Sequence, residues 1–163
     1  MNKSPKLICK NVWKLYGDNP KKFLESHNNN PDQEMIKKAG YIQAIRNASL
    51  EVYENEILVI MGLSGSGKST LVRCMSRLVD PTIGEIFFEN IDMGKLSKNE
   101  LIEIRRHKMG MVFQHFALFP HRTVIENIAF PLEVQGINKK DREKSALEII
   151  ELVGLQGRED YFP

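Results

Sequence analysis

A glycine-rich turn between an apolar run and a helical pattern is the feature that most constrains this chain. The apolar run, residues 57–61 (ILVIM), is continuous, as in a strand of a parallel sheet covered on both faces. The turn that follows, residues 62–69, fits the pattern G-x-x-x-x-G-K-[ST]. A helical pattern then continues to Leu78. The sequence therefore predicts a buried strand, a phosphate-binding loop and a helix, in that order.

Each part of this pattern has a role in holding a nucleotide. Glycines allow the backbone to turn tightly around a phosphate because they carry no Cβ. The free N–H groups of the turn and the positive end of the following helix then face the anion. In such a loop Lys68 reaches the β- and γ-phosphates, and the Ser69 hydroxyl ligates Mg²⁺. The alternative is a glycine-rich surface turn that precedes a lysine by chance, and the flanking strand and helix patterns argue against it.

The composition is that of an ordinary globular protein. Of the 163 residues, 42% are hydrophobic and 27% are charged, which is enough apolar material for a buried core. A formal net charge of +2 gives no basic field, so nucleic acid is not an expected partner. The first residues show no apolar signal-peptide core, and no apolar run approaches the roughly 18 residues of a membrane span. We therefore expect a cytosolic protein.

Alternating or apolar stretches predict further strands at 6–12, 41–46, 48–53, 85–89 and 109–113. Asn55, in the turn before the glycine-rich region, is suited to a positive φ. The stretch 109–113 (MGMVF) is a second buried apolar strand, and Gln114 ends it. A polar side chain in that position commonly points into a ligand crevice at the carboxyl end of an α/β sheet. A solvent-facing loop glutamine is the equally weighted alternative.

Helical patterns are predicted over 21–26, 32–39, 97–107, 123–131 and 138–153. The first two lie in a polar stretch, 19–40, which we interpret as a solvated insertion. Ser97 with Glu100 forms a capping-box pattern, as does Thr123 with Glu126. Pro131 is expected to disturb the helix that Thr123 begins.

Hydrolysis of a bound nucleotide needs a carboxylate at the end of a buried strand, where it can hold Mg²⁺. Glu89 and Asp92 follow the stretch 85–89, but its alternation suits a hairpin better than a buried parallel strand. We therefore interpret both acids as structural. Because no other acidic strand follows, we expect the chain to be truncated.

Cysteine and histidine residues indicate no metal site. Cys9 and Cys74 are far apart, and Cys74 is expected as a small core residue. His107, His115 and His121 do not have the spacing of a zinc site, so we expect them at the surface.

Aromatic residues lie before the glycine-rich turn as well. Trp13 and Tyr16 could each stack on a nucleotide base or simply pack.

Taken together, these motifs resemble the ATP-binding subunit of an ABC transporter. The resemblance covers residues 7–163 and rests on GLSGSGKST (62–70), MGMVFQ (109–114) and FALFPHRTVIENIAF (116–130). Within that family, the chain looks most like the glycine betaine/L-proline (osmoprotectant) importers. This finer resemblance rests on the longer segments 62–86 and 105–130 and on the insertion between Tyr16 and Ala44. Most importer ATPases have a shorter link there, so the insertion is a candidate marker of the subgroup.

The resemblance implies an α/β fold of the P-loop NTPase type. Its parts would be an ABC-type nucleotide-binding domain with an antiparallel β subdomain and the start of a helical subdomain. Residues 1–163 would then form a partial ATP-binding domain, with inserted short helices at 19–40, the Walker A loop at 62–70 and the helical subdomain from 114 to 163.

It also implies the cofactors ATP and Mg²⁺ and the residues that bind them. The Walker A residues would be Gly62, Leu63, Ser64, Gly65, Ser66, Gly67, Lys68, Ser69 and Thr70. Gln114 would be the Q-loop glutamine, which senses Mg²⁺ and the γ-phosphate. Lys68 and Gln114 are thus the expected catalytic residues, and Ser69 and Gln114 the expected metal ligands. Tyr16, but not Trp13, stands where the family has its adenine-stacking aromatic residue.

The implied partners are those of a transport complex. They are an integral membrane permease on whose inner face the chain would lie, a second ATP-binding subunit in a homodimer and, indirectly, an extracytoplasmic substrate-binding protein. ATP binding would close the dimer and hydrolysis would reopen it, which drives transport.

Several motifs of the family have no counterpart in the 163 residues. These are the signature motif, the Walker B aspartate, the catalytic glutamate and the switch histidine, a position that none of the four histidines, His27 included, occupies. We therefore expect a C-terminally truncated domain that binds ATP and lacks the residues for hydrolysis. One alternative is a non-functional fragment. Another is a soluble ABC ATPase of repair or translation, for which a basic surface or nucleic-acid motifs would be expected.

Overall fold

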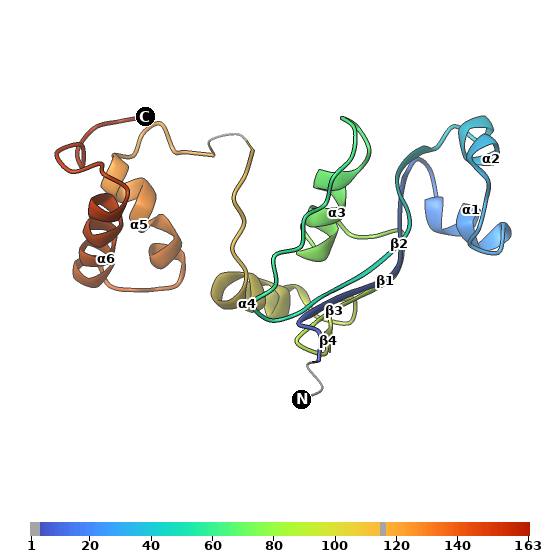
Figure 1. Ribbon diagram of the computed structural model, residues 1–163, viewed down its shortest axis with the longest axis horizontal. Helices are drawn as coiled ribbons and strands as arrows, with labels where there is room; N and C mark the ends of the chain where they lie inside the picture. Colours follow the sequence, from blue (N-terminus) through green and yellow to red (C-terminus); the bar gives the residue numbers. More distant parts are fainter. Residues whose placement is uncertain (1–3, 115–116) are drawn as a thin grey trace. The chain divides into compact units, whose positions relative to one another are not determined.

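The computed structural model describes residues 4–114 and 117–163 and forms two compact units, which we describe separately (Figure 1). The first unit is Met1–Leu101 and the second is Ile102–Pro163. The first contains β1 (Leu7–Tyr16), α1 (Pro20–Ser26), α2 (Gln33–Lys38), β2 (Ile42–Val52), α3 (Lys68–Met75), β3 (Ile83–Phe88) and β4 (Ile91–Asp92). The second contains most of α4 (Lys98–Lys108), with α5 (Val124–Val134) and α6 (Lys139–Leu152). His115 and Phe116, which belong to motifs named above, lie outside the described residues.

β1 is an inner strand of an antiparallel sheet with the order β2-β1-β3-β4. The sheet confirms the strands predicted at 6–12 and 85–89, and the stretches 41–46 and 48–53 form one strand, β2. Asn47 between them adopts a φ of 46°, where two β2 residues face one residue of β1. Such a bulge bends a strand without ending it, which explains why the sequence suggested two strands. β2 pairs along β1 as far as Tyr16, which faces Ile42.

β3 and β4 form a tight hairpin, as the alternation of residues 85–89 predicted. The loop residues Glu89 and Asn90 have φ values of 50° and 64°, and Phe88 pairs with Ile91. The Glu89 carboxylate lies 3.5 Å from the ammonium of Lys6.

Asp92, at the other side of this hairpin, is also engaged in local structure. Its carboxylate lies 3.0 Å from Lys95 Nζ and accepts a hydrogen bond from Gly94 N. The Lys95 interaction holds the pKa of Asp92 below its ordinary value. Both acids therefore make local contacts at the hairpin, in line with their structural interpretation.

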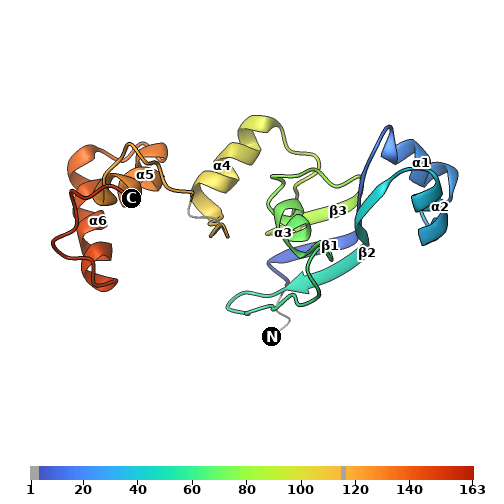
Figure 2. The same ribbon diagram turned by 90° about the horizontal axis from the view of Figure 1, so that it is seen from above.

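The polar stretch between β1 and β2 contains two short helices, as predicted, and Figures 1 and 2 show them together at the end of that strand pair. Asp32 caps α2 by accepting a hydrogen bond from Met35 N. The apolar side of this pair is not solvated: Leu24 of α1 and Ile36 of α2 are buried in one cluster with Trp13 and Leu15 of β1. Trp13 is therefore a packing residue.

Both cysteines are buried in the first unit, Cys9 in β1 and Cys74 in α3. Burial raises the pKa of Cys9 to about 11 and also raises the pKa of Cys74. The prediction of Cys74 as a small core residue is confirmed.

The two apolar runs predicted as buried strands, 57–61 and 109–113, are not strands. Ile57 is 90% exposed and Val112 is fully exposed. A strand needs partners for its N–H and C=O groups, and a parallel strand also needs cover on both faces. Within residues 4–114 and 117–163, the paired strands are β1 to β4 alone, and neither run has a neighbour among them. The prediction of a strand that ends at Gln114 is therefore wrong for this structure.

The second unit is helical, and its helices begin where the capping patterns predicted. The Glu100 carboxylate accepts hydrogen bonds from Ser97 N and Oγ, at 2.8 and 2.7 Å. Thr123 and Glu126 form a full capping box at the start of α5. The predicted disturbance at Pro131 is wrong, because α5 continues through it to Val134.

α6 begins after Asn138, as predicted, but buries a narrower stripe than expected. Ala146 and Ile150 are buried, whereas Ile149 and Val153 are exposed. Figures 1 and 2 show α5 and α6 side by side, so one face of α6 is covered there. No helix among the described residues is long and apolar enough to cross a membrane.

We expect Leu24→Ala to lower the free energy of unfolding by about 2–5 kcal/mol, because it leaves a cavity in the cluster around Trp13. Urea unfolding followed by the emission of Trp13, the single tryptophan, measures the change. Lys22→Ala is the matched control: Lys22 is exposed on the same helix, so a change within about 0.5 kcal/mol is expected. Equal effects of the two substitutions would show that α1 does not pack on the sheet.

Candidate phosphate-binding site

The glycine-rich turn runs directly into the amino terminus of α3. Gly67 is the N-cap residue, with a φ of 90°, and Lys68 is the first helical residue. The intrahelical ladder begins with Leu71 N donating to Gly67 O at 2.8 Å. The N–H groups of the first turn have no intrahelical acceptors and carry the positive end of the helix dipole. This end of α3 therefore favours an anion.

Gly67 is the one glycine of the turn at which the backbone of another element leaves no room for a Cβ. A Cβ on Gly67 would lie 1.9 Å from the carbonyl oxygen of Ala44 in β2, well inside any real contact. Its positive φ independently disfavours a side chain. The turn is thereby held against β2, which explains why a glycine stands before the lysine.

Lys68 folds back into the turn. Its Nζ donates hydrogen bonds to Gly62 O at 2.8 Å and to Leu63 O at 2.7 Å, with a longer contact of 3.4 Å to Ser66 Oγ. The ammonium thus lies against the first residues of the turn, which leads into α3. A cation and free N–H groups at one place are the elements of a phosphate site.

Two adjoining hollows lie between this turn and β2. The larger, about 480 Å³, is lined by residues 43–46 of β2 and by the turn from Gly65 to Lys68. The smaller, about 220 Å³, extends the lining to Ile42, Ser69 and Thr70. The residues of β2 were missed by sequence reasoning, since no motif marks them and only strand pairing brings them to the turn.

Tyr16 lies close to this site through the same pairing. Tyr16 is the last residue of β1 and pairs with Ile42, which lines the smaller hollow. Its side chain is 43% exposed, whereas Trp13 is buried. Of the two aromatic candidates, only Tyr16 therefore presents a ring surface to a ligand.

Ser69 and Gln114, the two expected metal ligands, belong to different units. Ser69 is exposed in the first turn of α3, and a hydroxyl oxygen there suits a hard cation such as Mg²⁺, which also takes oxygens from a bound phosphate. Gln114 belongs to the second unit and is exposed in an irregular segment. In the described parts of the chain, no group of three His, Cys, Asp or Glu side chains could hold a metal ion.

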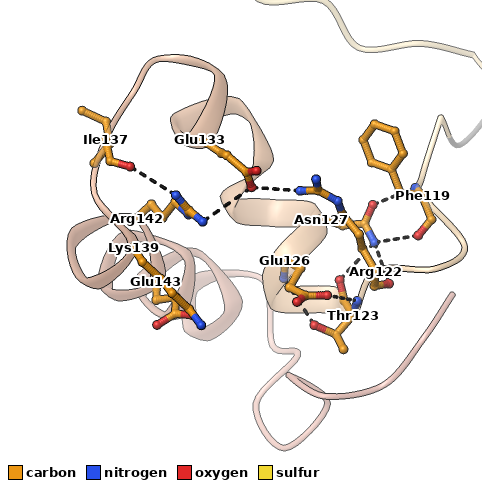
Figure 3. Close-up of polar contacts among 10 residues, drawn as sticks. All are labelled: Phe119, Arg122, Thr123, Glu126, Asn127, Glu133, Ile137, Lys139, Arg142 and Glu143. Atoms are coloured by element: carbon orange, nitrogen blue, oxygen red, sulfur yellow. Dashed lines mark hydrogen bonds and ion pairs between the residues drawn. The ribbon is translucent and has the colours of Figure 1, made fainter.

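The second unit holds the segment after Gln114 by a network centred on α5 (Figure 3). Asn127 Nδ2 donates to the carbonyl oxygens of Phe119, Arg122 and Thr123, and Asn127 Oδ1 accepts from Phe119 N. One side chain thus fixes the loop that enters α5.

Glu133 adds an ionic connection to the same network. It accepts a 2.9 Å hydrogen bond from Arg122 and lies 3.7 Å from Arg142 of α6 (Figure 3). The Arg122 hydrogen bond holds the pKa of Glu133 below its ordinary value.

His107 and His121 are both exposed, as expected from the sequence. His107 lies 3.4 Å from the Glu103 carboxylate, and His121 packs edge-on against Phe119.

A glycine-rich turn that leads into a helix amino terminus, with a lysine folded back into it, defines a phosphate-binding protein of the P-loop class. The model of the ABC transporter family matches residues 45–162, and the chain belongs to that family.

Its relatives include two ATP-binding proteins of transport systems. One is the trimethylamine N-oxide transport system ATP-binding protein TmoW of Pelagibacter ubique, 54% identical over 98% of this chain and 47% of that protein. Another is the glycine betaine/proline betaine transport system ATP-binding protein ProV of Escherichia coli, 43% identical over 97% and 40%. This chain spans less than half of the length of both.

Solved structures give the same fold. The chain is similar to the ATP-binding cassette MJ0796 in a dimeric structure bound to ADP and Pi, with a TM-score of 0.76 and 34% identity. The similarity covers 96% of this chain and 61% of that one.

We expect Gly67→Ala to lower the free energy of unfolding by about 3 kcal/mol or more, from the positive φ and the collision with Ala44 O together. Gly65→Ala is the matched control, because Gly65 has a φ of 77° but a Cβ there meets nothing within 4 Å. It should cost about 1–2 kcal/mol, from backbone strain alone. Chemical denaturation of both variants measures the difference, and similar losses would contradict the contact with β2.

Proposed function

We propose that the chain binds ATP with Mg²⁺ through residues Gly62 to Thr70. The observation that carries this proposal is the position of Lys68 Nζ, held by the carbonyl oxygens of Gly62 and Leu63 in the turn that leads into the amino terminus of α3. In the bound state the γ- and β-phosphates replace those carbonyl oxygens as partners of the ammonium. Membership of the ABC transporter family supports the choice of a nucleotide over other phosphates.

The same proposal assigns roles to three further residues that would contact the nucleotide or its metal ion. Ser69 supplies a hydroxyl ligand to Mg²⁺, Gln114 contacts the metal and the γ-phosphate, and Tyr16 stacks on adenine. The exposed position of Ser69 in the first turn of α3 supports its role as a metal ligand. The exposure of Tyr16 supports its role in stacking on adenine. The role of Gln114 rests on the family resemblance alone.

We also propose that the chain is the amino-terminal part of the ATP-binding subunit of an importer. Its partners would be an integral membrane permease, a second ATP-binding subunit and, through the permease, an extracytoplasmic substrate-binding protein, and it would lie on the inner face of the membrane. Support comes from relatives named for transport systems and from the dimeric structure of the MJ0796 cassette. The network around Asn127 is a fixed loop of the kind that a protein partner can dock against.

The substrate class follows from the names of these relatives. Glycine betaine, proline betaine and trimethylamine N-oxide all combine a fully alkylated nitrogen with an anionic oxygen. The trimethylamine N-oxide proteins are 54% and 55% identical to this chain, and the Bacillus subtilis glycine betaine protein OpuAA is 46% identical. We propose that the transported substrate is an osmolyte of this chemical class. Trimethylamine N-oxide thus joins glycine betaine and proline, the substrates expected from the sequence, as a candidate.

On its own, the chain is proposed to bind ATP without turning it over. Glu89 and Asp92, the two acids considered as a carboxylate for Mg²⁺, are engaged in ion pairs at the β3–β4 hairpin, which supports this proposal. The exposed apolar run 57–61 also leaves the turn without a buried strand before it.

Binding is tested by titrating the chain with a fluorescent ATP analogue in the presence of Mg²⁺. We expect saturable binding that Lys68→Ala weakens at least about tenfold, since it removes charge-assisted hydrogen bonds to phosphate. Lys98→Ala, which changes an exposed lysine at the first position of α4, should leave the affinity unchanged. Absence of saturable binding would favour a non-functional fragment, and steady ATP turnover abolished by Lys68→Ala would refute the proposed lack of hydrolysis.

The proposed partner is tested by co-purification. Tagged chain expressed in its own cell type should be recovered from detergent-solubilised membranes with an integral membrane permease. Asn127→Ala should reduce that recovery, because the loop between Phe119 and Thr123 loses its hydrogen bonds. Recovery with soluble proteins only would favour a soluble ABC ATPase instead.

A further inference from the structure

A lysine covers one side of the Tyr16 ring. Lys14 precedes Tyr16 by two residues on β1, so the two side chains leave the sheet on the same face. The Lys14 ammonium lies 4.8 Å from the centre of the tyrosine ring, which is a cation–π contact. Tyr16 is still 43% exposed, which leaves surface for contact with a flat ligand.

The position of this ammonium is set by the segment after α3. Lys14 Nζ donates a 2.9 Å hydrogen bond to Asp80 O. The Asp80 carboxylate in turn accepts a 2.7 Å hydrogen bond from Arg77 Nε, just beyond the end of α3. Two hydrogen bonds from Thr82 then fix the same segment to β1, one from Thr82 N to Trp13 O at 2.7 Å and one from Thr82 Oγ1 to Leu15 O at 3.3 Å.

The charge of Lys14 is also felt inside α3. Burial raises the pKa of the Cys74 thiol, and the nearby charge of Lys14 opposes that rise. The lysine thus lies between the ring of Tyr16 and the helix that begins at the phosphate-binding turn.

We propose that Lys14 is a positioning residue for base recognition: it holds the Tyr16 ring from one side so that the opposite side is presented to the nucleotide base. The inference rests on the proposed nucleotide function and adds a residue to it. Lys14 is anchored at Asp80, in the segment that follows α3, whereas the phosphate-binding turn leads into the amino end of the same helix.

The test compares ATP with inorganic tripolyphosphate, which has the phosphates and no base. Lys14→Met keeps the aliphatic stem and removes the charge. We expect it to weaken ATP binding about twofold to fivefold, which corresponds to the free energy of an exposed cation–π contact. Binding of tripolyphosphate should be unchanged. Lys14→Arg keeps a cation over the ring and should restore the affinity for ATP.

The chain offers a matched control. Lys10 lies on the same strand with its Nζ 4.9 Å from the centre of the Phe87 ring, an equivalent contact that is not at the ligand site. Lys10→Met should change neither affinity. Unchanged emission of the buried Trp13 and an unchanged Tm would show that each variant is folded.

The role through Tyr16 is tested by a double-mutant cycle. In the Tyr16→Ala background, Lys14→Met should have no further effect on the affinity for ATP. Additive losses, or an equal loss for tripolyphosphate, would overturn the positioning role. A wild-type chain that binds tripolyphosphate and ATP equally well would overturn base recognition by both residues, whereas one that binds neither would overturn the proposed function itself.

Discussion

The antiparallel pairing of β1 with β2 is the interaction on which the first unit depends. It places Tyr16 opposite Ile42 at one end and keeps Ala44 where its carbonyl oxygen meets Gly67. The glycine-rich turn is held beside the sheet by this close approach, and not by a preceding buried strand. The same strand pair carries Trp13, against which the helices of the insertion pack. The proposed phosphate site, the proposed base-binding ring and the buried cluster around Trp13 thus share one strand pair.

In the second unit, the loop before α5 is held by polar contacts. Asn127 satisfies three carbonyl oxygens of the loop before α5, and Glu133 joins that loop to α6 through Arg122 and Arg142. Such a network fixes one loop conformation because each partner would be left unsatisfied in any other. A preformed loop has little ordering entropy to lose when a partner binds.

Local patterns were predicted well where the chemistry is local. The capping boxes at Ser97 and Thr123 were readable because cap and partner lie three residues apart. Apolar runs were predicted poorly: residues 57–61 and 109–113 have the composition of buried strands, yet none of them is buried in this structure. Composition shows that a segment can be buried, but partner strands decide whether it is. Pro131 similarly has the chemistry of a helix breaker, yet α5 continues through it.

By itself the sequence determined the glycine-rich turn that leads into α3, because its glycine spacing acts through backbone geometry over a few residues. It also determined the family, through motifs that are contiguous in the chain. Only the tertiary structure decided between Trp13 and Tyr16 as the exposed ring, and only it showed Ala44 against Gly67 and Lys14 over Tyr16. Those relations depend on strand register and on contacts between residues up to about 66 positions apart, as from Lys14 to Asp80, and no local pattern contains them.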